Sequence, residues 1–127
     1  MFSKNAFRAY DIRGIYPDEV NSELAKKVAV VLSEKFFGEG AVVIGRDIRI
    51  GSKEMYEEAI SALRGENREV IDVGIITTPM LTFLINDLEA AGGIIITASH
   101  NPKEYNGIKM LKEKAVPIGG EEVWEKM

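Results

Sequence analysis

Residues 41–74 read AVVIGRDIRIGSKEMYEEAISALRGENREVIDVG, and this stretch decides the fold. Its first five residues, 41–45, form a short apolar run that ends in glycine and suits a strand buried on both faces. Ser52 begins an amphipathic stretch that predicts a helix as far as Gly65, and residues 70–74 predict the next strand. The apolar residues of that helix recur at helical spacing: Met55, Ala59, Ile60 and Leu63. A strand, a helix and a strand at this spacing predict a βαβ unit with parallel strands.

Helical patterns lie on both sides of this unit. Upstream, Asn21 and Ser22 are available as caps for a helix, and apolar residues follow them at the spacing of one helical face: Leu24, Val28, Val31, Leu32 and Phe36. Downstream, Thr78 followed by Pro79 predicts a cap and a short helix toward Leu88. Helices therefore alternate with strands along the chain.

Two further apolar runs, residues 93–97 and 108–111, predict a third and a fourth strand. The loop between them is too short for a helical crossover, so the fourth strand should return antiparallel to the third. Gly119 and Gly120 precede acidic residues, which predicts the start of a last helix. We expect an α/β protein, a three-layer α/β/α domain with a mixed, mainly parallel sheet.

Composition limits the possible functions. The chain has 127 residues, 46% hydrophobic and 28% charged, which fits one globular domain. A net charge of −4 argues against a general nucleic-acid-binding surface. With 0 cysteines and 1 histidine, a thiolate or multi-histidine metal site is excluded, so any metal must bind through oxygen atoms. The apolar runs are too short to cross a membrane, and residues 1–13 lack the apolar core of a signal peptide. We expect a cytoplasmic protein.

Polar residues follow each of the three predicted parallel strands. In such sheets, ligands bind outside the carboxyl ends of the strands, which lie along one edge. The polar residues at these ends are Arg46 and Asp47, Thr77 and Thr78, and Thr97, Ser99 and His100. We expect the functional site at this edge.

Residues 97–102, TASHNP, place a hydroxyl, the only imidazole and an amide in one tight loop. Pro102 biases Asn101 away from the helical region, so the loop should be stiff and able to hold Ser99 outward. The same residue types also occur in ordinary turns, and composition alone leaves both interpretations open. The chain has no Gly-x-Ser-x-Gly elbow and no glycine-rich nucleotide fingerprint, which argues against acyl transfer and against a nucleotide fold.

Several cations are expected near this loop: Arg8, Arg13, Arg46, Arg49 and Lys109. Guanidinium groups match phosphate oxygens, whereas the ammonium of a lysine is a point charge that can donate or shuttle a proton. For any single arginine the alternative is a surface ion pair, such as Arg13 with Asp11 or Arg46 with Asp47. Only the convergence of these cations on one edge favours a phosphate site.

Three segments resemble those of the α-D-phosphohexomutase family, which comprises phosphomannomutases and phosphoglucomutases. Residues 7–14, FRAYDIRG, resemble its opening motif, and residues 43–49, VIGRDIR, resemble its first buried strand and turn. Residues 97–102, with YNGIK at 105–109, resemble its phosphoserine loop. The resemblance covers nearly the whole chain and implies that residues 1–127 are the N-terminal domain of such an enzyme, truncated before the usual domain boundary.

The resemblance also implies a reaction. Phosphorylated Ser99 would give its phosphoryl group to a hexose phosphate, forming a bisphosphate, and would recover the other phosphoryl group, which interconverts the 1- and 6-phosphates. His100 and Lys109 would act as acid/base or charge-stabilising groups, and Arg13 would be a cation near the transferred group. Tyr10 and Arg13 would contact substrate. Phosphoserine carries a charge of about −1.5 to −2, so Mg²⁺ is expected, bound through the phosphate of Ser99 with its other ligands in a missing domain.

The expected partners are a hexose phosphate and the downstream domains of the same enzyme, with no nucleic acid and no membrane. Without those domains, the 127 residues should be inactive. Two alternatives stay open: a non-catalytic module that binds phosphate or sugar phosphates, and a purely structural or interaction fragment.

Overall fold

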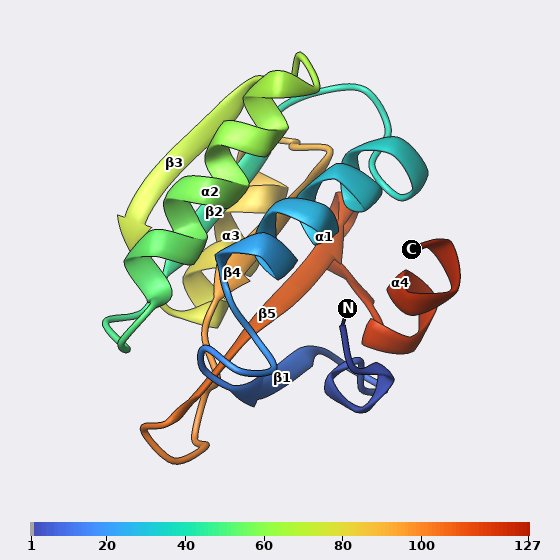
Figure 1. The fold of residues 1–127 in the computed structure, drawn as a ribbon. Coiled ribbons are helices and arrows are strands. Elements are labelled where there is room, and N and C mark those ends of the chain that lie inside the picture. The colour runs from blue at the N-terminus through green and yellow to red at the C-terminus, as the bar shows by residue number, and fades with distance from the viewer. Residues whose placement is uncertain (1) are drawn as a thin grey trace.

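A computed structural model describes residues 2–127 (Figure 1). Its elements in chain order are η1 (Lys4–Ala6), β1 (Ile12–Ile15), α1 (Ser22–Lys35), β2 (Val42–Arg46), α2 (Ser52–Gly65), β3 (Val70–Ile75), α3 (Thr78–Asp87), β4 (Gly92–Ile96), β5 (Tyr105–Lys112), η2 (Glu113–Ala115), β6 (Val116–Ile118) and α4 (Gly120–Lys126). Every helix and strand expected from the sequence is present. Within the described residues, no helix is long and apolar enough to cross a membrane.

The strands form one six-stranded mixed sheet within residues 2–127, in the order β1-β5-β4-β2-β3. Strand β2 pairs in parallel with β3 and β4, and β5 returns antiparallel to β4, so the predicted parallel and antiparallel pairings are confirmed. Strands β1 and β6 both pair antiparallel with β5, at residues 105–108 and 110–112. They therefore share the edge of β5 that β4 leaves open.

Side chains of the central strands alternate between two apolar layers, because successive residues of a strand point to opposite faces. Val42 and Ile44 pack with the buried residues of α1, α2 and α4, whereas Val43 packs with Leu81 and Ile85 of α3. Figure 1 shows α1 and α2 in front of the sheet and α3 behind it. The predicted three-layer α/β/α architecture is confirmed.

The first two helices follow the predicted pattern. In α1, the side chain of Asn21 accepts the N–H of Leu24 at 2.9 Å, so Asn21 rather than Ser22 is the cap. The predicted apolar residues of α1 and α2 are buried, apart from Phe36, which is partly buried. These two amphipathic faces pack together on one side of the sheet.

The predicted cap of α3 is wrong by one residue. Thr77 is extended, with φ −100° and ψ 164°, and its side chain accepts the N–H of Met80 at 3.4 Å. Thr78 is therefore already the first helical residue, and Pro79 the second. The error arises because both threonines can cap, and only the backbone conformation decides between them.

Candidate functional site

A pocket of about 610 Å³ opens at the carboxyl edge of the parallel strands. Its polar lining comes from the ends of all three strands and from β5: Asp47 after β2, Thr77 and Thr78 after β3, Thr97, Ser99 and His100 after β4, and Lys109 on β5. The predicted meeting of these strand ends at one edge is present, since all three contribute to the lining of this pocket.

Ser99 occupies the tip of the loop that follows β4, in a left-handed conformation with φ 56°. Its N–H donates to the Oγ1 of Thr97 at 3.0 Å, and the side-chain amide of Asn101 donates to the carbonyl of Ala98 at 2.7 Å. Both Ser99 and His100 are exposed. Within residues 2–127, Ser99 forms its hydrogen bonds through the backbone, so the hydroxyl remains available at the pocket. The expected loop that holds Ser99 outward is therefore present.

Lys109 and Arg13 meet on one buried carboxylate. The Oδ2 of Asp11 lies 3.4 Å from Lys109 Nζ, and its Oδ1 lies 3.5 Å from Arg13 Nε. Lys109 lines the pocket, whereas Arg13 and Asp11 are outside the lining, and Arg13 is connected to Lys109 through Asp11. The ion pair between Arg13 and Asp11, the alternative interpretation of this arginine, is thus present alongside the proposed site.

The other predicted residues lie outside the pocket. Tyr10 is 81% exposed before β1 and does not line the pocket. The guanidinium of Arg46 lies over the ring of Tyr56, 5.7 Å from its centroid, and donates to the carbonyl of Asp47. Arg49 points into the Ser99 loop, where its donors bind backbone carbonyls. Arg8 is exposed and does not line the pocket either. Of the five cations expected to converge on one phosphate site, only Lys109 therefore lines the pocket.

Charge near the pocket favours an anion. Three cations, Arg13, Arg49 and Lys109, are paired with two carboxylates, Asp11 and Asp47, which leaves one positive charge in excess. The first turn of α3 also lines the pocket through Thr78 and Pro79, and a helix N-terminus carries partial positive charge. A phosphate group is electrostatically suited to this site.

The residues present do not form a metal site on their own. Within residues 2–127, no group of three His, Cys, Asp or Glu side chains could hold a metal ion. Asp47 provides the one carboxylate that lines the pocket. This carboxylate already accepts hydrogen bonds from the Ser52 hydroxyl at 2.5 Å and from the backbone N–H of Arg49 at 3.0 Å. Mg²⁺ bound through a phosphate on Ser99 therefore stays a prediction.

Three polar residues that shape the site were not identified as site residues from the sequence: Asp11, Ser52 and Asn106. Asn106 is fully buried, and its amide donates to the carbonyl of Ile50 at 3.0 Å and to the hydroxyl of Ser52 at 2.9 Å. The available signal was a polar residue at the start of an apolar strand, since buried polar groups need partners. Nothing in the spacing indicates which partners these are.

The fold and the pocket define the class of this protein as an α/β/α domain with polar side chains at the carboxyl ends of its parallel strands. A family model described as "Phosphoglucomutase/phosphomannomutase, alpha/beta/alpha domain I" matches residues 4–125. The chain belongs to this family, as its N-terminal α/β/α domain, and the resemblance seen in the sequence is confirmed.

Individual relatives agree with this assignment. The chain is 46% identical over 116 residues to "Phosphohexose mutases" of Xanthomonas campestris, covering 91% of this chain and 26% of that protein. It is 36% identical over 121 residues to a "Phosphomannomutase" of Klebsiella pneumoniae, covering 95% and 76% respectively. A crystal structure of a phosphoglucomutase/phosphomannomutase family protein from Burkholderia thailandensis superposes with a TM-score of 0.84 at 30% identity, covering 98% of this chain and 29% of that one. The chain thus spans 26% of the Xanthomonas protein and 29% of the Burkholderia chain, but 76% of the Klebsiella protein.

Proposed function

We propose that this chain is the phosphoserine-carrying domain of a phosphohexomutase, which interconverts hexose 1-phosphate and 6-phosphate through a bisphosphate intermediate in the cytoplasm. The observation that carries the proposal is the position of Ser99, exposed at a strand end in a pocket shared with His100 and Lys109. The names of these relatives support hexose phosphates as the substrate class.

In the proposed reaction, a hydroxyl oxygen of the hexose phosphate attacks the phosphorus of phosphorylated Ser99, and the bond between phosphorus and Oγ breaks. The attacking hydroxyl loses its proton to a base and Oγ gains one, which yields a hexose bisphosphate and free serine. Return of the other phosphoryl group restores phosphoserine and releases the isomeric monophosphate. Such a transfer depends mainly on alignment and on neutralising charge, so an ordinary serine beside cations is sufficient.

Lys109 is the proposed proton donor to Oγ. It lines the pocket with Ser99, and the buried carboxylate of Asp11 limits where its ammonium group can lie. His100, exposed in the same pocket, is the proposed partner in acid/base chemistry. Arg13 would act from behind Asp11 by adding positive charge, and the exposed ring of Tyr10 would contact substrate at a point outside the pocket.

The rest of the reaction needs groups from further domains. A hexose bisphosphate must present each of its ends to Ser99 in turn, and one sheet edge offers no opposing wall to hold the far phosphate. Orientation contributes about 7–11 kcal/mol to such rates, so we propose that the 127 residues alone have no measurable mutase activity, with or without Mg²⁺. Downstream mutase domains would supply the far phosphate site and the remaining metal ligands.

The test is a mass measurement of protein purified from its native host. We expect the added mass of one phosphoryl group, and peptide mapping should locate it on Ser99. Ser99→Ala should lack the added mass and, in the complete mutase, should lose nearly all conversion of glucose 1-phosphate to glucose 6-phosphate. Ser61→Ala, a change at an exposed serine of α2 outside this pocket, should retain both. Activity of the Ser99→Ala enzyme within a few-fold of wild type would refute the proposal.

A further inference from the structure

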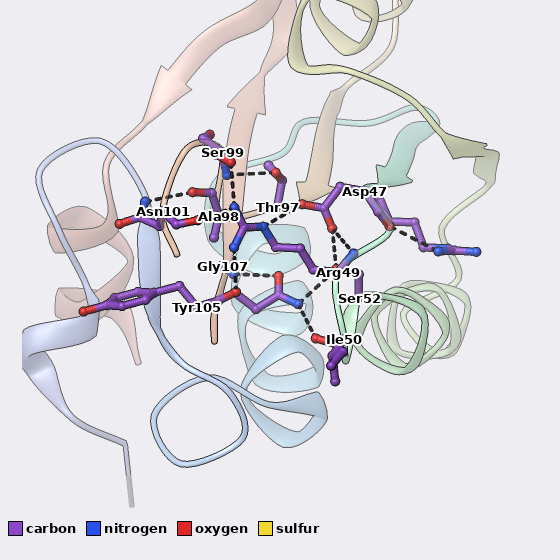
Figure 2. Close-up of polar contacts among 12 residues, drawn as sticks. Asp47, Arg49, Ile50, Ser52, Thr97, Ala98, Ser99, Asn101, Tyr105 and Gly107 are labelled. Carbon is purple, nitrogen blue, oxygen red and sulfur yellow. Dashed lines mark hydrogen bonds and ion pairs between the residues drawn. The ribbon is translucent and has the colours of Figure 1, made fainter. Parts of the chain in front are cut away.

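The guanidinium of Arg49 has all of its donors committed to the backbone and to one carboxylate. Nη1 donates to the carbonyls of Pro102 and Tyr105 at 2.6 and 3.2 Å. Nη2 donates to the carbonyls of Ser99 and Asn101 at 2.7 and 2.6 Å. Its Nε faces the carboxylate of Asp47 at 3.4 Å. Figure 2 shows this side chain reaching from the loop after β2 into the Ser99 loop.

This arrangement leaves no donor for a ligand. An arginine has five N–H groups, and here four point at carbonyl oxygens and one at Asp47. Only 16% of the side-chain surface is exposed. Arg49 could bind a phosphate only by releasing the loop, so a direct substrate contact does not account for its position.

The loop between β4 and β5 needs hydrogen-bond donors from outside itself, such as those of Arg49. Residues 99–104 belong to no helix or strand, and three of their carbonyls converge on the guanidinium of Arg49 together with the carbonyl of Tyr105, the first residue of β5. Ser99 is held at φ 56°, a conformation that non-glycine residues adopt only when their surroundings enforce it. Asp47 anchors the arginine in turn, because its Oδ1 accepts hydrogen bonds from the backbone N–H of Arg49 and from the hydroxyl of Ser52.

We propose that Arg49 is a positioning residue for phosphoryl transfer: it clamps the loop so that the hydroxyl of Ser99 stays in the pocket with Lys109. This inference rests on the proposed function of Ser99. The forked guanidinium is essential to it, since a lysine has a single nitrogen with three donors and cannot reach four separate carbonyls. A lysine, which supplies the same positive charge, should therefore not hold the loop as Arg49 does.

The matched pair of variants is Arg49→Lys and Arg46→Met. The first keeps the charge and loses the forked guanidinium. The second removes a neighbouring arginine that lies over Tyr56, donates to the carbonyl of Asp47 and, within the described residues, donates no hydrogen bond to residues 99–105. Amide hydrogen exchange on the 127-residue chain gives the first measurement. In Arg49→Lys, the N–H groups of Asn101 and Tyr105 should exchange at least about 10-fold faster, because their acceptors lie within the loop. The amides of β4 should keep their protection, as they report the fold itself.

The second measurement is steady-state kinetics of the complete mutase that carries this segment. Arg49→Lys should lower kcat by about 10²-fold with a much smaller change in KM, since misplacing a reacting group by about 1 Å has an effect of that size. Arg46→Met should match wild type in both loop exchange and kcat. If Arg49→Lys fails to fold, Asp47→Asn weakens the same clamp through its anchor and should show the same direction of change in exchange and in kcat.

The possible outcomes separate the clamp from the proposed function. Unchanged exchange of the loop amides in Arg49→Lys would overturn the clamp. Faster exchange with an unchanged kcat would overturn the positioning role. Absence of phosphate on Ser99 in the wild-type enzyme would refute the proposed function itself, and the catalytic role of Arg49 with it, independently of the exchange data.

Discussion

Ser99 is strained in the conformation that presents its hydroxyl, and this strain can be measured. We compare Ser99→Gly with Ser99→Ala, because both remove the hydroxyl but only glycine adopts φ 56° freely. The alanine variant should match wild type in stability within about 0.5 kcal/mol, since the hydroxyl makes no hydrogen bond within residues 2–127 and is exposed.

The expected difference follows from two opposing terms. A left-handed conformation costs a non-glycine residue about 1–2 kcal/mol, and glycine removes this cost. Glycine also gives the unfolded chain more freedom, which lowers stability by about 0.5–1 kcal/mol relative to alanine. The glycine variant should therefore be more stable than the alanine variant by about 0.5–1 kcal/mol, which is a rise of about 2–5 °C in Tm for a domain of this size.

Urea unfolding and thermal melts of the three proteins, run in parallel, give the free energies of unfolding. Both variants should lack phosphate on residue 99, so the measurement compares a gain in stability with a loss of function at one position. A Ser99→Gly protein that melts at or below Ser99→Ala would refute the reasoning, because Ser99 would then not be held under strain.

Three further predictions concern other side chains. Lys109→Met should fold normally but slow single-turnover transfer from phosphorylated Ser99 by about 10² or more, and an unchanged rate would make Lys109 only a strand residue. Arg68 donates to the carbonyls of Ser33 and Phe37 at the end of α1, at 2.8 and 3.0 Å, so Arg68→Met should lower the free energy of unfolding in urea by about 2 kcal/mol. Burial raises the pKa of Tyr56 above its ordinary 10.0, so the stability it contributes is complete below about pH 10 and falls as the pH rises further. Tyr56→Phe should reduce the fall in urea midpoint between about pH 9 and about pH 11, and an equal fall in both proteins would contradict this.

The parallel strands were predictable because their signal is local. Residues 42–45 and 92–96 are apolar runs buried on both faces, and glycines or caps mark their ends. The antiparallel return of β5 also followed from the length of one loop. Predicting the edge of the sheet where the candidate site lies required only these strands and the rule that ligands bind at the carboxyl ends of parallel strands.

The strand Ile12–Ile15 was missed because its pattern is not that of a strand. Arg13 and Gly14 interrupt the apolar residues, and the segment is ordered by pairing with β5, about 95 residues further along. The role of Arg49 was missed for the same reason, since its acceptors lie 50–56 residues away. Long-range pairing has no signature in local sequence, so the guanidinium could be recognised as a cation but not as a backbone clamp.

The pairing of β1 with β5 has a consequence for the order of events during synthesis. Residues 12–15 are synthesised 90–96 residues before the partners with which they pair, at 105–108. Asp11 likewise cannot form its contact with Lys109 until that lysine, 98 residues later in the chain, has been synthesised. The βαβ units between them can form from nearby contacts, whereas this closure joins distant segments and is intrinsically slow. The nascent chain can therefore form the helices and strands between residues 22 and 96 first, and it completes the contacts around Lys109 only after residue 109 has emerged.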